Sequence, residues 1–374
     1  MKITESSGKT IFVAISCIGN DTELIRTVKS CIENASFPER IHVGVNLVYG
    51  RSVSENPQYI YAIEEKLSNF SRVRYVVNRT KRPLSIARDR NNASDLYGQQ
   101  DYILQVDSHC YFTGGWDEEL ISAHQSAIVI SGNEKTLITA TLPMYTLNEN
   151  AIEDIAVPEN VSFGYGFWEN FFIEVENNEK NRIPSWRHTG PEMLSWQLEK
   201  MVQSTGFAPA PKITGAFIFG NRYFADAMKM PEHIIFWEEE IIHSIELLSS
   251  GFTLVYPYML ANIYHYYQLD ETNTGRGARA GLSEIIISSV EDSVEDVEFS
   301  LNSDEIEEYA IEWRRMVNES FSSYLDNPAN AEKIKQYEKY SGINFKTGIA
   351  KFEFPKYYAN IGKYPAGEGV QNVE

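Results

Sequence analysis

The sequence has few basic residues for its length. Its 374 residues include 33 Lys and Arg against 52 Asp and Glu, so the formal net charge is −19 at pH 7. Proteins that coat nucleic acid or anionic membranes need a net basic face, and this balance argues against both classes. A local basic site remains compatible with the charge, but nucleic acid is not an expected partner.

The chain also lacks a disulfide framework and a long apolar segment. Its three cysteines, Cys17, Cys31 and Cys110, suit a reducing compartment. Residues 1–9 are polar and have no apolar signal core. No window approaches the ~20 apolar residues of a membrane-spanning helix. We therefore expect a soluble, cytoplasmic protein without a membrane span.

Enough apolar sequence is present for a sizeable core, because hydrophobic residues make up 43% of the chain and aromatic residues 13%. The length corresponds to roughly two domains, or to one large domain with an extension. Residues 280–313 contain eleven acids and no Lys or Arg, and residues 303–325 follow a helical pattern. We predict one domain over residues 1–280 and a small, acidic, mainly helical lobe over residues 281–374 that packs on it.

Apolar runs alternate with helical patterns through the first third of the chain. The expected strands are residues 10–18, 40–48, 73–77 and 102–106, and the expected helices between them are residues 21–34, 57–69 and 85–99. This alternation predicts an open α/β sheet with helices on both faces, whose ligands bind beyond the carboxyl ends of the strands. Further strands are expected at residues 136–144, 162–176, 212–220, 254–258 and 263–267, and further helices at 192–203 and 237–249.

Two side chains that can bind metal follow the fourth expected strand. Asp107 and His109 are separated by one residue, where the strand gives way to a loop. Carboxylate oxygen and imidazole together suit Mn²⁺. The spacing alone leaves an alternative open, in which Asp107 caps the following turn and His109 lies on the surface.

The residues around this pair resemble a known enzyme family. Residues 101–112 (DYILQVDSHCYF), followed by the Gly-Trp-Asp of 115–117, resemble the Asp-Ser-His block of the cytoplasmic N-acetylglucosaminyltransferases that modify hydroxyproline on Skp1. The block is also similar to that of polypeptide N-acetylgalactosaminyltransferases. Five further segments agree in order: residues 32–45 (IENASFPERIHVGV), 84–88 (LSIAR), 236–240 (FWEEE), 264–267 (YHYY) and 337–345 (YEKYSGINF). Both families are nucleotide-sugar glycosyltransferases, so the resemblance implies a GT-A fold for residues 1–280.

The resemblance implies a metal site of three residues. Asp107 and His109 match the family's metal-binding pair, and His265 matches the later histidine that completes the site. The expected cofactor is Mn²⁺, or Mg²⁺. From the residues alone, the favoured interpretation of His265 is a core histidine packed between its neighbouring tyrosines.

The resemblance also implies a binding site for a UDP-sugar donor. Arg88 matches an arginine that faces the donor diphosphate, and guanidinium groups suit phosphate. Arg90 is the weaker candidate, because residues i and i+2 of a helix point in different directions. A solvated helix face paired with nearby acids is the alternative for Arg88. The remaining donor candidates are Ser16 and Asn46 at expected strand ends, Ser108 in the metal block, and Arg276 and Arg279 in a glycine-rich loop.

Acids at the start of an expected helix match the family's acceptor side. Glu239 and Glu240 align with two acids of a Gly-Glu-Glu block, whereas Glu238 stands where the family has glycine. Because the Skp1-type enzymes retain anomeric configuration, these acids would orient the acceptor or stabilise the developing positive charge on the sugar. The helix macrodipole offers a purely structural reason for acids here. Trp237 would form a wall against the sugar, or belong to the core.

Together these features predict a metal-dependent glycosyltransferase. It would move a sugar, GlcNAc by resemblance, from a UDP-sugar to a hydroxyl group of a protein or glycan acceptor, with retention. The absence of a phosphate-binding glycine fingerprint argues against a kinase or dehydrogenase. Two alternatives stay open: an inactive GT-A-like protein that binds sugar or acts as a scaffold, which the Glu238 departure favours, and an enzyme acting on another glycan or on modified DNA.

Overall fold

The computed structural model describes residues 8–18, 21, 23–49, 57–79, 85–148, 151–156, 175–176, 179–180, 206–236, 238–257, 262–266, 303–346 and 349–350. Its centre is an eight-stranded sheet in the order β11-β13-β6-β12-β4-β1-β2-β3. These strands are β1 (Ile11–Ile18), β2 (Ile41–Tyr49), β3 (Val73–Arg79), β4 (Tyr102–Asp107), β6 (Thr136–Thr139), β11 (Phe207–Pro209), β12 (Phe217–Asn221) and β13 (Thr253–Pro257). The four expected N-terminal strands lie side by side and parallel.

The second half of the sheet is mixed. β12 runs antiparallel to both β4 and β6, β13 is parallel to β6, and β11 is antiparallel to β13. Four two-stranded sheets accompany the main one: β5 (Cys110–Phe112) with β14 (Ile263–His265), β7 (Thr146–Asn148) with β8 (Ala151–Ala156), β9 (Val175–Glu176) with β10 (Glu179–Lys180), and β15 (Ile343–Asn344) with β16 (Ile349–Ala350).

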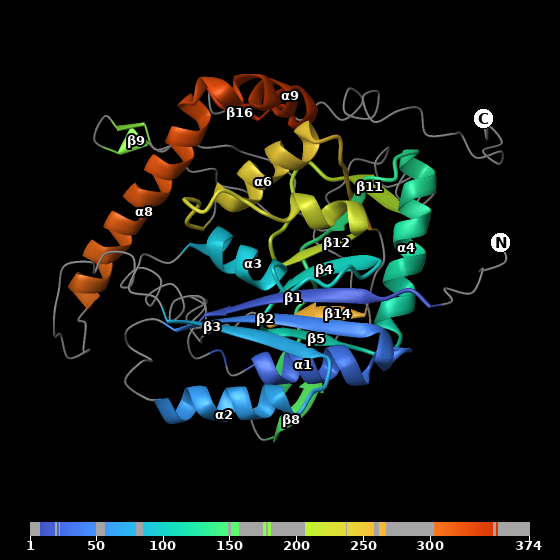
Figure 1. Ribbon diagram of the computed structural model, residues 1–374. Helices are drawn as coiled ribbons and strands as arrows, with labels where there is room; N and C mark the ends of the chain where they lie inside the picture. The colour runs from blue at the N-terminus through green and yellow to red at the C-terminus, as the bar shows by residue number, and fades with distance from the viewer. Residues whose placement is uncertain are drawn as a thin grey trace.

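Helices cover both faces of the sheet (Figure 1). On one face lie α1 (Leu24–Glu33), α2 (Pro57–Ser68) and α4 (Trp116–Ser131), and on the other lie α3 (Ile86–Ser94), the 3-10 helix η3 (Arg222–Ala227) and α6 (Glu238–Ser249). Short 3-10 helices also occur at Pro38–Arg40 and Pro328–Asn330. β1 explains the unbroken apolar run in the sequence. Val13 and Ile15 of this strand pack in the core on the α1 and α4 face of the sheet, and Phe12 and Ala14 pack in the core on the α3 and α6 face. Both faces of the strand are therefore buried.

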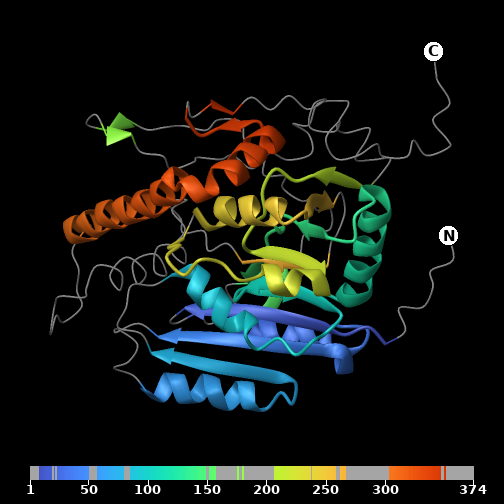
Figure 2. The same cartoon turned by 45° about the horizontal axis from the view of Figure 1, so that its top comes forward.

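Two C-terminal helices form a further layer, which Figure 2 shows beyond α6. α8 (Ser303–Asp326) and α9 (Ala331–Ser341) bury Phe321 and Tyr337 against Ile241 and Ile245 of α6. The helix predicted at 303–325 is present, and it shares a core with α6 of the sheet domain. The predicted boundary between residues 280 and 281 lies outside the described residues. Among the described helices, none has the length and apolar character needed to cross a bilayer.

Several expected elements are shorter in the structure. The strand expected at 212–220 begins only at Phe217, because a turn over residues 211–216 is held by buried polar contacts to α6. The strand expected at 136–144 ends at Thr139, and the helix expected at 85–99 ends at Ser94. The expected helix at 192–203, and the expected strand at 162–176 apart from β9, lie outside the described residues.

Candidate metal and donor site

Three side chains that can bind metal converge at the carboxyl edge of the sheet. β4 ends at Asp107, and a two-residue turn that carries His109 leads into β5. β14 pairs with β5 so that His265 lies opposite Cys110. His265 Nε2 thereby comes within 3.3 Å of Asp107 Oδ2, although the two residues are 158 positions apart. One ligand atom from each of Asp107, His109 and His265 lies within 4.8 Å of the other two.

The electrostatics of Asp107 and His265 favour metal binding. Burial alone would raise the pKa of Asp107, but the hydrogen bond from His265 and the charge of Arg90 hold that pKa well below its usual range. Burial lowers the pKa of His265, and the neighbouring His109 lowers it further. The site therefore holds an ionised carboxylate beside a neutral imidazole, which are the forms that bind metal. One carboxylate and two imidazoles fit Mn²⁺ as a ligand set.

Asp21, which the sequence did not indicate as a site residue, also lies here. Asp21 Oδ2 lies 2.8 Å from His109 Nδ1 and accepts a hydrogen bond from Ser108 Oγ. Asp21 Oδ1 accepts the backbone N–H of Glu23 at 2.9 Å. Burial opposes ionisation of Asp21, but the hydrogen bond and charge of His109 lower its pKa. Two features of the sequence could have pointed to it, since it is acidic and follows the strand that lies beside β4.

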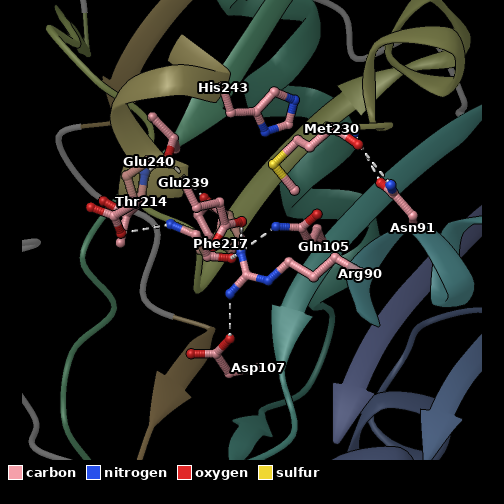
Figure 3. A network of polar contacts seen from close by, with 12 residues as sticks. Arg90, Asn91, Gln105, Asp107, Thr214, Phe217, Met230, Glu239, Glu240 and His243 are labelled. Atoms are coloured by element: carbon pink, nitrogen blue, oxygen red, sulfur yellow. Dashed lines mark hydrogen bonds and ion pairs between the residues drawn. The ribbon is translucent and has the colours of Figure 1, made fainter. Parts of the chain in front are cut away.

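A buried arginine joins the metal-site carboxylate to the acids of α6 (Figure 3). Arg90 Nη2 donates to Asp107 Oδ1 at 3.0 Å, and Nη1 donates to Glu239 Oε1 at 2.6 Å and to the Gly215 carbonyl at 2.7 Å. Arg90 is 8% exposed. Its guanidinium therefore fixes α3, β4, α6 and the turn at Gly215 relative to one another.

The structure places the two candidate arginines of α3 in different surroundings. Arg90, and not Arg88, points into the cluster of Asp107 and Glu239. Arg88 is partly exposed, with Nε 3.6 Å from Asp89 Oδ1. Burial raises the pKa of Asp89 to about 7 in spite of this arginine. The helical spacing of i and i+2 correctly predicts that the two arginines point in different directions. It does not predict which of them points toward the edge of the sheet.

The three glutamates at the start of α6 have different surroundings. Glu240 accepts hydrogen bonds from the fully buried Lys212 and from the Gly215 N–H. Burial raises the pKa of Glu239 to about 7, although Arg90 opposes the shift. Glu238 reaches back to accept the N–H groups of Ile235 and Phe236. The acid at the position where the resembled family has glycine is thus an N-terminal cap of α6.

The comparisons with known proteins match this geometry. A family model described as Glycosyltransferase (GlcNAc) matches residues 51–274, which is more than half of the chain. The chain belongs to this GlcNAc glycosyltransferase family. The matched range includes Asp107, His109 and His265. A search of curated protein sequences finds no match.

Solved structures were also compared with this family member. GalNAc-T7, solved with UDP, GalNAc and Mn²⁺, matches with a TM-score of 0.50 and 14% identity over 88% of this chain and 54% of its own. The chain thus spans about half the length of the GalNAc-T7 chain. S. aureus TarS 1–349 matches with a TM-score of 0.40 and 13% identity over 91% of this chain and 81% of its own. The GalNAc-T7 likeness and the mixed sheet confirm the predicted GT-A fold.

The remaining donor candidates of this glycosyltransferase lie around the same edge of the sheet or outside the described residues. Ser16 lies in register between Asn46 and Asp107 on the neighbouring strands. Asn46 is buried and donates through Nδ2 to the Asp89 carbonyl at 2.9 Å, so its side chain supports α3. Ser108 binds Asp21, as described above. Trp237, Arg276 and Arg279 lie outside the described residues, and their roles stay predictions.

Proposed function

We propose that this family member is a metal-dependent enzyme that moves GlcNAc from UDP-GlcNAc to a hydroxyl group of a protein or glycan, with retention of configuration. The observation that carries the proposal is the convergence of Asp107, His109 and His265 at the carboxyl edge of a GT-A sheet. GT-A sheets bind ligands at this edge for the same reason as other open α/β sheets, since the connections leave the strands there. A cytoplasmic location is part of the proposal.

The expected cofactor is Mn²⁺, held by Asp107, His109 and His265. The GT-A neighbour GalNAc-T7 was solved with UDP and Mn²⁺, which supports a UDP-sugar donor and this ion. When bound, Mn²⁺ supplies a Lewis acid that stabilises the negative charge on the departing diphosphate. The protein's own contribution is a carboxylate that Arg90 keeps ionised and oriented by a bond to Asp107 Oδ1.

The acceptor would approach the start of α6. Glu240 is held by Lys212 and the Gly215 N–H, so its role is to fix the turn that carries Gly215. Glu239 lies closer to the metal ligands in the network, since Arg90 bridges it to Asp107. We assign Glu239 to orienting the acceptor hydroxyl, or to stabilising the positive charge that develops on the sugar. The charge of Arg90 favours the ionised form of Glu239 and opposes the burial that raises its pKa.

The test is a panel of UDP-sugars, with UDP release measured in the presence and absence of Mn²⁺. We expect turnover with UDP-GlcNAc that requires the metal and that is lost in Asp107→Ala and His109→Ala. Asp101→Asn is the matched control, because Asp101 is also a carboxylate bonded to Thr10, at the opposite end of β1. Metal-dependent turnover that survives in both site variants would contradict the proposal. Calorimetry of UDP with Mn²⁺ separates an inactive scaffold from an enzyme whose acceptor is missing.

A further inference from the structure

Asp21 lies next to the metal group because of the order of the strands. β1 and β4 are parallel neighbours, and Ser16 near the end of β1 lies in register with Asp107. Asp21, three residues after β1, lies beside the turn of Ser108 and His109. Asp21 is mostly buried there, with 16% of its side chain exposed, and its Oδ2 lies 2.8 Å from His109 Nδ1.

The two oxygens of Asp21 face different parts of the molecule. Oδ1 accepts the N–H of Glu23, just before α1, which is an ordinary Asx-turn contact. Oδ2 accepts from Ser108 Oγ and contacts His109. Thr27 of α1 also contacts this turn, since its Oγ1 lies 2.7 Å from the carbonyl oxygens of Ser108 and Cys110. The start of α1 thus fixes both the position of the carboxylate and the backbone that carries His109.

We infer that Asp21 is a positioning residue, which holds His109 with its proton on Nδ1 so that Nε2 is left to bind the metal. A carboxylate with no proton can only accept, so the imidazole nitrogen that faces it must donate. In the neutral imidazole the other ring nitrogen then keeps its lone pair. The ring packs against His265 with centroids 4.5 Å apart. Carboxylate–histidine–metal triads of this kind orient the ring and raise its basicity as a ligand. The inference rests on the proposed metal site.

A purely structural role of Asp21 and the positioning of His109 predict different results when Asp21 is removed. If Asp21 only held the turn before α1, its removal would lower the stability of the protein and leave the metal affinity of the folded molecules unchanged. If Asp21 positions His109, metal affinity falls in molecules that remain folded. Loss of such a carboxylate partner costs about 10–100-fold in metal affinity.

The experiment is titration calorimetry of Mn²⁺ without any sugar nucleotide, on folded protein checked by circular dichroism. We expect a Kd about 10–100-fold higher in Asp21→Ala. Asp21→Asn should lose less, because its amide oxygen still accepts the His109 Nδ1–H, and it serves if Asp21→Ala does not fold. Asp101→Ala is the matched control, since it removes a carboxylate from the other end of β1 and should bind Mn²⁺ like the unaltered protein.

Long-range ¹H–¹⁵N NMR of the metal-free protein, at a pH where the ring is neutral, gives a second readout. His109, assigned by loss of its signals in His109→Gln, should carry its proton on Nδ1. A proton on Nε2, or an unchanged Kd in folded Asp21→Ala, overturns the inference and leaves the metal site standing. If the unaltered protein binds no Mn²⁺, or binds it as well after His265→Ala, the proposed function fails and the inference fails with it.

Discussion

The histidines at the carboxyl edge of the sheet differ from those in its packed layers. His109 and His265 lie against the carboxylates of Asp21 and Asp107. His124 and His243 are buried more deeply, yet each donates Nε2–H to one main-chain carbonyl, of Thr136 and Ala227 respectively. Their rings contact Phe219 and Phe224. Burial is thus common to structural and candidate functional histidines, and carboxylate neighbours are what separate them.

The strongest test of this comparison substitutes one histidine from each class and compares the activities of the two variants. His265→Ala removes a candidate metal ligand, and loss of several kcal/mol of charge stabilisation should reduce Mn²⁺-dependent UDP release by at least about 100-fold. His124→Gln keeps a donor for the Thr136 carbonyl and should keep the turnover. Equal activities of the two variants would remove the functional distinction between the two classes.

The turn at Gly215 offers the next largest effect. A methyl group at Gly215 would lie 2.4 Å from Arg90 Nη1, and the buried guanidinium cannot move aside without leaving Asp107 or Glu239. Gly215→Ala should therefore cost about 1–3 kcal/mol of stability and should also lower turnover. Urea unfolding and UDP release measure the two effects. Gly114→Ala is the control, since a methyl group there meets no atom within 4 Å. A fully active Gly215→Ala would show that the position of Arg90 is unimportant.

The pH dependence of stability should reveal the structural histidines. Burial lowers the pKa of His124 to about 4, below its ordinary value of 6.5. The unfolded chain therefore binds more protons between these values, and the stability contributed by neutral His124 is lost as pH falls from about 6.5 to about 4. At pH 5 the free energy of unfolding has lost about 2 kcal/mol through His124.

The variant His124→Gln makes this pH-dependent loss of stability measurable. The free energy of unfolding of the unaltered protein should fall more between pH 7.5 and pH 5 than that of the variant, because glutamine does not titrate in this range. Urea unfolding at the two pH values gives both differences. Parallel losses in the two proteins would mean that His124 is not held neutral by its surroundings.

The pattern of apolar residues along the chain explains why most of the fold was predictable from the sequence. β1 and β4 are buried on both faces, so their apolar runs and the helical spacing between them indicate a parallel sheet with two helical layers. Asp107 and His109 could be found because they are separated by only one residue and lie at the end of a strand. His265 was found only by resemblance to a family, because its place depends on the pairing of β14 with β5.

The parts that the sequence did not predict depend on contacts between distant elements. Asp21 meets His109 because β1 lies beside β4, and Lys212 meets Glu240 because the turn before β12 packs on α6. Local periodicity contains no information on either contact. The direction of Arg90 depends likewise on how α3 is rotated against the sheet. Side chains that connect elements are therefore the ones that single-sequence reasoning ranks poorly.

The two ends of α6 extend the comparison to ion pairs and give the smallest expected effect. At its start, Glu239 and Glu240 pair with buried Arg90 and Lys212, whereas near its end Glu246 pairs with Lys333 of α9, whose side chain is 38% exposed. Solvent screens such a pair, and Tyr324 still donates to Glu246 at 2.6 Å when the lysine is gone. Lys333→Ala should cost less than about 1 kcal/mol in urea unfolding and leave UDP release unchanged. A larger loss of stability, or any loss of turnover, would show that the packing of α8 and α9 on α6 influences the site at the other end of the helix.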